Sequence, residues 1–368
     1  MTTFFLNRLA TEPHALAFAG QSTPWPVALA DQTTDPSLDE ALRGHVAAAG
    51  RLLTPVAADL LATTGRPVDL FGFAPNPARL GAAADATASV EGVALTQLGA
   101  LLDLEHLGYS VAQAKPLAVL GHSQGVLAVH MTRAIEAAGS IEAAGTTLDE
   151  ILAVAALIGA AGTRRVRELG LNPKYGEASP MLSVKGATRA QVEALVARVN
   201  NARGPISIAV TNSDNHHVLS GYPEDLAAFA LEAEREHQHQ AKLREQKLHG
   251  GTVFNPTLEY LEVTLPFHSP LMADAVEQTV AWAGACGFDQ KRTRALAEEV
   301  LLNHVDWNAR VKALFGRRRP VQAVDRGPRP RQHARQADRQ RGAGHRHRRG
   351  RSHHAGRALH ALHAGKRA

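Results

Sequence analysis

The chain has 368 residues, of which 45% are hydrophobic, and a formal net charge of +5. This is enough chain for one large domain or two smaller ones. A single cysteine, Cys286, excludes a disulfide framework and a cysteine-based zinc site. The first residues lack the apolar core of a signal peptide, and we find no run of about 18 apolar residues. We therefore expect a cytoplasmic protein without a membrane span.

The first half of the chain alternates short apolar runs with helical patterns. The runs that predict strands are residues 14–19 and 116–120, and the first of them is followed by a turn over 20–24. The patterns that predict helices are residues 38–63, 89–107, 126–135 and 147–169. Strands that alternate with helices are typical of a parallel sheet covered by helices. We expect an α/β-hydrolase-like sheet.

The pattern changes near residue 178. Expected strands at 181–185, 206–210, 217–220 and 258–264 are interleaved with expected helices at 189–199 and 223–246. The resulting order, β-α-β-β-α-β, is that of a ferredoxin-like unit. We therefore predict a large domain over residues 1–177 and 265–316, interrupted by a ferredoxin-like insertion over 178–264.

Residues 317–368 form a basic tail with 16 Lys and Arg against 2 Asp and Glu, while the rest of the chain has 24 against 33. One interpretation is a nucleic-acid-binding arm, but no aromatic residue is interleaved to stack on bases. The other is a gene translated out of frame: residues 325–338 can be encoded so that the next frame reads IVDLGPGNMLGKLT. We favour the second hypothesis. We expect a disordered tail and no nucleic-acid partner.

The segment Gly121-His-Ser-Gln-Gly125 lies between an expected strand and an expected helix. A strand, a sharp turn and a helix are the setting of a nucleophile elbow, in which the serine is lifted clear of the backbone. The start of the helix offers free N–H groups and a positive dipole end to a developing oxyanion. This pattern predicts Ser123 as a nucleophile that attacks an acyl carbon.

A serine nucleophile needs a base, and His268 is the strongest candidate among the histidines. It follows the insertion in the segment Leu265-Pro-Phe-His-Ser-Pro-Leu-Met272, where two prolines stiffen the loop. His122 points to the other side of the turn and is expected to pack. The pair His216-His217 is expected in a surface turn, without a third ligand at metal spacing. We predict no metal site.

The oxyanion needs two donors. The backbone N–H of Gln124, just after the nucleophile, is expected to supply one. The turn after the first strand is a source of the second, at Gln21.

Four segments in order resemble the acyl-CoA:acyl-carrier-protein transacylase family, the malonyl/acetyltransferase domains of fatty acid and polyketide synthases. Phe18-Ala-Gly-Gln-Ser22 is similar to the family's oxyanion loop, and Gly121–Gly125 to its elbow. Pro266–Met272 is similar to its histidine segment, and Asn303-His-Val-Asp-Trp307 to its N-P-V-x-W segment. The elbow glutamine and the start at Met1 are most similar to the N-terminal acetyltransferase domain of type I fatty acid synthases.

The resemblance implies a Ser123–His268 dyad that transfers an acyl group from CoA to the thiol of an acyl carrier protein. It implies an acyl-serine intermediate, oxyanion donors at Gln21 and Gln124, and the main-chain carbonyl of Asp306 as the group that orients His268. The acyl-CoA is a substrate, so no cofactor is expected. The expected process is fatty acid synthesis.

Family members that use malonyl groups carry an arginine on a helix after the elbow. A gapped alignment places Ile158 there, which favours an acetyl or other short uncharged acyl group, because an apolar residue cannot compensate a buried carboxylate. Arg164 and Arg165 lie nearby in sequence. If the alignment of this helix is shifted so that an arginine takes the position of Ile158, a malonyl-selective transferase is expected instead.

Three other interpretations stay open. A serine esterase or thioesterase would need an acid between the serine and the histidine, and Asp214 and Asp225 are its candidates. A nucleic-acid binder would use the tail. The third interpretation is an inactive remnant of a synthase domain. The resembled family has a Gly-Pro-Gly segment after N-P-V-x-W, and this segment is absent from the given reading frame.

Overall fold

A computed structural model describes residues 12–21, 24–65, 86–171, 178–199, 203–248, 250 and 253–316. Two compact units divide the chain, Met1–Arg319 and Pro320–Ala368. The basic tail lies outside the described residues, so its disorder and its frame stay predictions.

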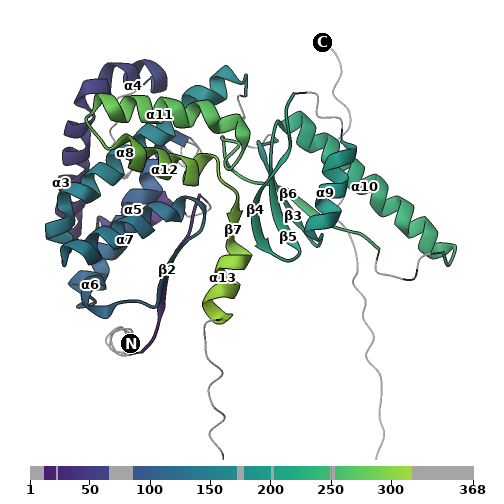
Figure 1. The fold of residues 1–368 in the computed structure, drawn as a ribbon, viewed down its shortest axis with the longest axis horizontal. Helices are drawn as coiled ribbons and strands as arrows, with labels where there is room; N and C mark the ends of the chain where they lie inside the picture. The colour runs from purple at the N-terminus through teal and green to yellow at the C-terminus, as the bar shows by residue number, and fades with distance from the viewer. Residues whose placement is uncertain are drawn as a thin grey trace, which may run out of the picture. The chain divides into compact units, whose positions relative to one another are not determined.

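The elbow belongs to a pair of parallel strands, β1 (Ala15–Phe18) and β2 (Ala118–Gly121), with Phe18 opposite Gly121 (Figure 1). These are the only strands of the predicted large sheet within the described residues. The helices that precede β2 are α2 (Trp25–Gln32), α3 (Pro36–Leu52), η1 (Thr54–Val56), α4 (Ala57–Thr64), α5 (Ala86–His106) and α6 (Val111–Ala114). The sequence patterns predicted no helix at α2 or α6.

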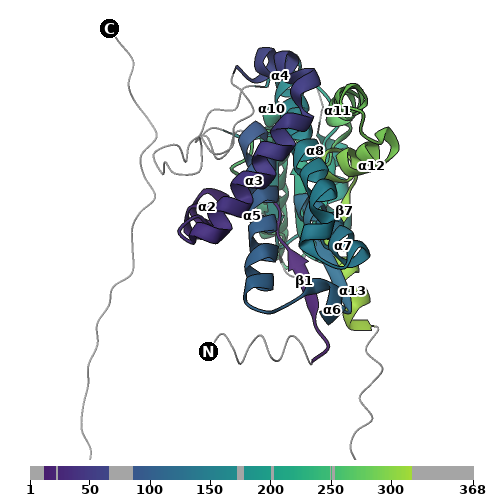
Figure 2. The ribbon, with the colours of Figure 1, turned by 90° about the vertical axis from the view of Figure 1, so that its left-hand side faces the viewer.

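The helix α8 (Ile141–Glu168) follows the elbow and α7 (Val126–Ala138), and it lies in the core. It runs beside α5 and α7 in both ribbon views (Figures 1 and 2). Length and composition alone would let α8 cross a membrane, as would α3 and α4 together if their bend is ignored. However, 67% of the apolar window of α8 is buried inside the fold, as in the core helix of a soluble protein.

Residues Met181–Tyr260 form the second structural region. Its elements are β3 (Met181–Lys185), α9 (Arg189–Arg198), β4 (Ser207–Ser213), β5 (His216–Ser220), α10 (Pro223–Glu245) and β6 (Thr257–Tyr260). This is the predicted β-α-β-β-α-β order. The sheet order is β6-β3-β5-β4, and these neighbours are antiparallel.

Strand alternation gives this sheet two different faces. Leu182 and Val184 of β3 pack with Leu219 of β5 in a separate apolar cluster. That cluster includes Val192 of α9 and Phe229 of α10, so the two helices cover this face. Figure 1 shows both helices on one side of the strands. The opposite face carries the odd-numbered residues of β3.

The chain then forms η4 (Pro270–Met272), α11 (Ala273–Ala285), α12 (Gln290–Leu301), β7 (Val305–Asp306) and α13 (Trp307–Gly316). The sequence predicted that residues 265–316 belong to the large domain. In the structure, β7 instead pairs in parallel with β4, with Val305 opposite Val210. The short strand comes shortly after α12, and its two residues pair with β4 at the edge of the smaller sheet.

Candidate active site

Ser123 lies at the tight turn between β2 and α7, where η3 (Ser123–Gly125) begins. Its φ of 53° is in the left-handed region, which costs a residue with a Cβ roughly 1–2 kcal/mol. Two glycines make the turn possible. A Cβ on Gly125 would come within 2.9 Å of the Ala19 carbonyl oxygen, and one on Gly20 within 2.8 Å of the His122 carbonyl oxygen. The loop after β1 therefore packs directly against the elbow.

The structure brings Ser123 and His268 together from positions 145 residues apart: Ser123 Oγ lies 2.7 Å from His268 Nε2. His268 is 3% exposed and also has a left-handed backbone, with a φ of 56°. Its loop is held because the backbone N–H of Ser269 donates to the Leu301 carbonyl at 3.2 Å. The side chain of Ser269 in turn accepts a hydrogen bond from the Leu271 N–H.

The other ring nitrogen of His268, Nδ1, lies 2.8 Å from the carbonyl oxygen of Asn303. A carbonyl only accepts, so Nδ1 carries the proton and Nε2 is free to accept the Ser123 hydroxyl proton. The prediction that Asp306 supplies this carbonyl is wrong. The backbone of Asp306 is in register with Thr211 in the β4–β7 pair, and its side chain accepts from the Ala309 N–H.

Burial lowers the pKa of His268 from 6.5 to about 4, because an imidazolium loses its hydration in the interior. The hydrogen bond to Asn303 opposes this shift, and the nearby His122, His304 and Arg310 add to it. The imidazole of His268 is therefore neutral at pH 7.

The two predicted oxyanion residues meet across the turn. Gln124 is fully buried, its side-chain amide donates to the Val90 carbonyl, and the amide of Gln21 donates to Gln124 Oε1. This link joins the loop after β1 to the elbow. The side-chain amides of the two glutamines are thus engaged with each other and with Val90, and the role of their backbone N–H groups as oxyanion donors stays a prediction.

A cavity of about 300 Å³ opens over the serine and the histidine. Its elbow wall consists of Ala19, Gly20, Gln21, His122 and Ser123. Its sheet wall consists of Met181, Ser183, Lys185, Val210, Asn212, His216, Val218, Glu259 and Leu261. Val263, Phe267 and His268 complete the lining. The sheet wall is the face of the smaller sheet that α9 and α10 leave uncovered.

The sheet wall is apolar at one end and polar at the other. Met181, Leu261 and the nearby Val263 and Phe267 are apolar. At the other end, Lys185 Nζ lies 3.0 Å from Glu259 Oε2.

Two histidines take part in polar contacts at the sheet wall. Ser183 Oγ lies 3.1 Å from His216 Nε2, and His122 Nε2 lies 2.7 Å from Asn212 Oδ1. Burial, followed by the charge of Lys185, lowers the pKa of His216. The expected surface position of His216-His217 is wrong: His216 lines the cavity, and His217 is 1% exposed within β5. The alternation of Met181, Ser183 and Lys185 in the sequence is the signal that could have identified this wall.

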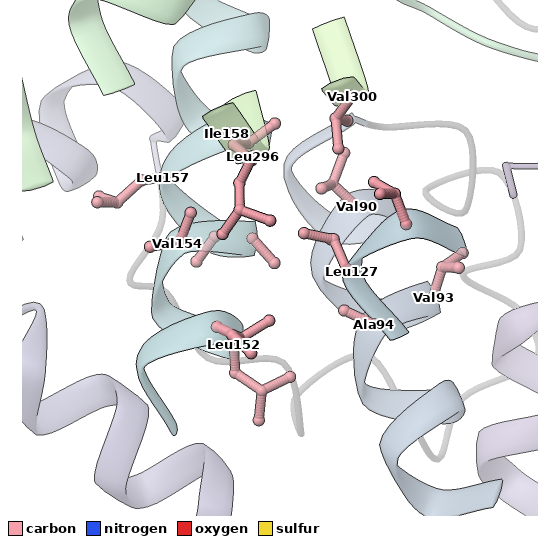
Figure 3. Packing of buried hydrophobic residues seen from close by; sticks show 14 of the residues in the cluster. Val90, Val93, Ala94, Leu127, Leu152, Val154, Leu157, Ile158, Leu296 and Val300 are labelled. Atoms are coloured by element: carbon pink, nitrogen blue, oxygen red, sulfur yellow. The ribbon is translucent and has the colours of Figure 1, made fainter. Parts of the chain in front are cut away.

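Ile158 is not part of the cavity lining. It is fully buried on α8, and Figure 3 shows it among Val154, Leu157 and Leu296 in the hydrophobic core. Its predicted role in choosing the acyl group is therefore not supported by its position. Arg164 and Arg165 also point elsewhere: Arg164 bonds to Glu168 and Gln278, and Arg165 to Leu271 and Asp274.

Comparison with known proteins shows which proteins this chain is similar to. Residues 180–260 match the family model of the fatty acid synthase central AT domain. Fatty acid synthase 2 of Mycosarcoma maydis is 30% identical over 168 residues, which cover 43% of this chain and 4% of that protein. The fatty acid synthase beta subunit TOXC of Cochliobolus carbonum is 29% identical over 163 residues, 40% of this chain and 8% of that protein. The chain thus matches a small part of these relatives.

Solved structures show the same fold. An acyl carrier protein S-malonyltransferase from Vibrio cholerae aligns over 83% of this chain and 87% of its own, with a TM-score of 0.55 and 14% identity. A malonyl-transacylase in complex with a type II polyketide synthase acyl carrier protein aligns over 83% and 86%, with a TM-score of 0.54 and 15% identity. The protein has the mixed α/β fold of acyltransferase domains. The resemblance to the acyl-carrier-protein transacylase family is confirmed.

Proposed function

We propose that this chain is an acyl-CoA:acyl-carrier-protein S-acyltransferase of fatty acid synthesis that works through an acyl-Ser123 intermediate. The observation that carries the proposal is the 2.7 Å contact between Ser123 Oγ and His268 Nε2 inside a cavity of about 300 Å³. The fatty acid synthase relatives and the acyltransferase fold support the same reaction class. The proposed chemistry uses acyl-CoA as a substrate and needs no metal or organic cofactor.

In the first half-reaction, His268 Nε2 takes the hydroxyl proton of Ser123 as Oγ attacks the thioester carbonyl. The backbone N–H groups of Gln21 and Gln124 are the proposed donors to the oxyanion. The carbon–sulfur bond breaks, and His268 returns the proton to the departing CoA thiolate. The second half-reaction runs in reverse with the pantetheine thiol of a carrier protein.

The carbonyl of Asn303 has the orienting role that an acid has in other serine enzymes. It fixes the tautomer of His268 at 2.8 Å without placing a negative charge beside the ring. The hydrolase alternative is not favoured, because neither of its candidate acids occupies this position. Asp214 bonds to Asn308 and Lys312, and Asp225 lies on α10.

The acyl group that fits the cavity is acetyl or another short uncharged one. Met181, Leu261 and Phe267 give the lining an apolar end. No arginine lines the cavity among the residues that the structure describes, and Lys185 is already paired with Glu259. A malonyl carboxylate would have to compete for that lysine. The proposed preference rests on these lining residues and not on Ile158.

A carrier protein is the proposed acyl acceptor, supported by the fold shared with a transacylase whose structure contains its acyl carrier protein. We also assign Met181–Tyr260 to the ferredoxin-like class, because its sheet order places the last strand beside the first and the third beside the second. In this proposal the insertion supplies the sheet wall, against which the substrate lies.

The test is intact-mass spectrometry after brief incubation with acetyl-CoA or malonyl-CoA, on the wild type and on Ser123→Ala. Acetylated protein is then chased with holo carrier protein or with buffer. We expect an acetyl adduct on the wild type alone, little malonyl adduct, and rapid loss of the adduct only when carrier protein is present.

Three results would contradict parts of this proposal. An adduct on Ser123→Ala would remove the serine from the mechanism. Loss of the adduct to buffer as fast as to carrier protein would identify a hydrolase. No adduct from either substrate, in protein with a cooperative melting transition, would identify an inactive remnant.

A further inference from the structure

Helix α13 reaches back to the elbow. Arg310, in its first turn, donates from Nη1 to the carbonyl oxygen of Gly121 at 2.9 Å, across 189 residues of sequence. Gly121 is the last residue of β2 and stands two residues before Ser123. The guanidinium therefore holds the backbone at the point where the strand turns toward the nucleophile.

The same helix is anchored on both sides of the cavity. The ring of Trp307 meets the ring of His122 edge-on, with centroids 5.2 Å apart. Asn308 Nδ2 and Lys312 Nζ each lie 2.7 Å from Asp214 Oδ1, in the turn between β4 and β5. Helix α13 is thus attached to the elbow through Trp307 and Arg310, and to the smaller sheet through Asn308 and Lys312.

The backbone of the elbow is strained at Ser123 and depends on contacts from other segments to keep its conformation. Ser123 has a left-handed backbone, and such a conformation persists only where the surroundings over-determine it. A hydrogen bond from a charged donor is about twice as strong as one between neutral groups. Because Arg310 lies outside β2 and α7, its bond to the Gly121 carbonyl resists a movement of the whole turn.

We propose that Arg310 is a positioning residue of this enzyme, which holds the elbow so that Ser123 Oγ is aimed at His268 Nε2. The inference rests on the proposed function for its kinetic readout, but not for its geometry. Arg310 touches neither reacting atom; it acts through the Gly121 carbonyl.

Arg310 also contributes to the electrostatics of His268. The groups around the imidazole are His122 of the elbow, the Asn303 carbonyl and His304 before β7, and Arg310 of α13. Burial is the largest cause of the lowered pKa of His268, and the positive charge of Arg310 adds to this lowering after the larger effects of His122 and His304. Loss of this charge therefore moves the acid limb of the rate profile to higher pH, which a purely structural support would not do.

The experiment compares three variants of the full chain: Arg310→Gln, Arg310→Lys and, as the matched control, Lys312→Gln. The control removes the ion pair of α13 with Asp214 without touching Gly121. Transfer from acetyl-CoA to holo carrier protein is measured from pH 4 to 8. Labelling of Ser123 by a fluorophosphonate is measured in parallel, because it reports the aim of the serine without requiring the proposed substrates. Thermal melting confirms that each variant is folded.

We expect Arg310→Gln to lower kcat and the labelling rate about 10- to 100-fold, the usual cost of a misplaced nucleophile, with KM changed less than about threefold. Arg310→Lys should recover the pH profile and part of the rate. Lys312→Gln should behave as the wild type.

Wild-type labelling rates in Arg310→Gln would overturn the proposal, and so would an equal loss in Lys312→Gln, which would show general undocking of α13. If Arg310→Gln does not fold, the other two variants decide. The proposal would then be overturned if Arg310→Lys labels at the wild-type rate at all pH values while Lys312→Gln labels more slowly. If the wild type labels but transfers no acyl group, the proposed function fails, and the labelling rates still decide the role of Arg310.

Discussion

The two walls of the cavity are built on different principles. The elbow wall depends on backbone geometry: Ser123 has a φ of 53°, and glycines at 20 and 125 let two chain segments touch. The sheet wall depends on alternation: every second side chain of β3 and β5 faces the cavity, while the others pack under α9 and α10. A change of side chain should therefore damage the first wall and only retune the second.

The largest expected effect concerns a glycine of the elbow wall. Gly125→Ala should destabilise the fold by about 3 kcal/mol, because its Cβ would overlap the backbone of Phe18 and Ala19. Gly44→Ala, on α3 with nothing within 4 Å of the new Cβ, should instead stabilise the fold by about 0.5–1 kcal/mol. Urea unfolding of both variants checks the pair. Equal changes in the free energy of unfolding would refute the backbone argument.

The burial of His268 makes the stability of the protein depend on pH. His268 has a folded pKa of about 4 and an ordinary value of 6.5, so between these values the unfolded chain binds a proton that the folded chain does not. The free energy of unfolding should fall as the pH falls through this window, by about 3 kcal/mol in total.

Urea unfolding of the wild type and of His268→Gln at pH 7 and pH 4 isolates this contribution, because the other titrating groups are common to both. We expect the wild type to lose about 3 kcal/mol more than the variant. Acylation by the wild type should stay constant from pH 7 down to about pH 5. A drop in acylation near pH 6.5 would show that His268 has an ordinary pKa.

The sheet wall should tolerate change and alter its preference. Glu259→Gln releases Lys185 from its 3.0 Å contact, so the ratio of malonyl to acetyl adducts should rise about tenfold, the size of one charge-assisted hydrogen bond. The double variant with Lys185→Met should return the ratio to that of the wild type. An unchanged ratio in Glu259→Gln would mean that Lys185 does not reach the acyl group.

The smallest effect separates backbone strain from chemistry at one position. Ser123→Gly and Ser123→Ala both lack the hydroxyl, but only alanine keeps a Cβ at a φ of 53°. The glycine variant should be more stable than the alanine variant by about 1 kcal/mol. Calorimetry of the two inactive proteins measures this difference, and a higher melting temperature for alanine would show that the turn is relaxed.

Sequence reasoning reached Ser123 and His268 because each lies in a short segment with its own local signature. It missed the Asn303 carbonyl because a main-chain acceptor leaves no residue type to recognise. It misplaced Ile158 because the register of a long apolar helix such as α8 cannot be set from a single elbow. The β-α-β-β-α-β order was predictable from periodicity, whereas the β4–β7 pairing depends on a two-residue strand with no periodicity of its own.

Both residues of the Ser123–His268 pair occupy a backbone region that suits glycine, as do Lys115 and Lys247 elsewhere in the described part of the chain. A library of this protein screened for heat resistance alone would therefore be drawn toward replacing the two residues that its proposed reaction requires. Engineering for higher thermal stability therefore has to keep residues 123 and 268 unchanged and to substitute other positions, for example Gly44 on α3, where an added Cβ meets no atom within 4 Å.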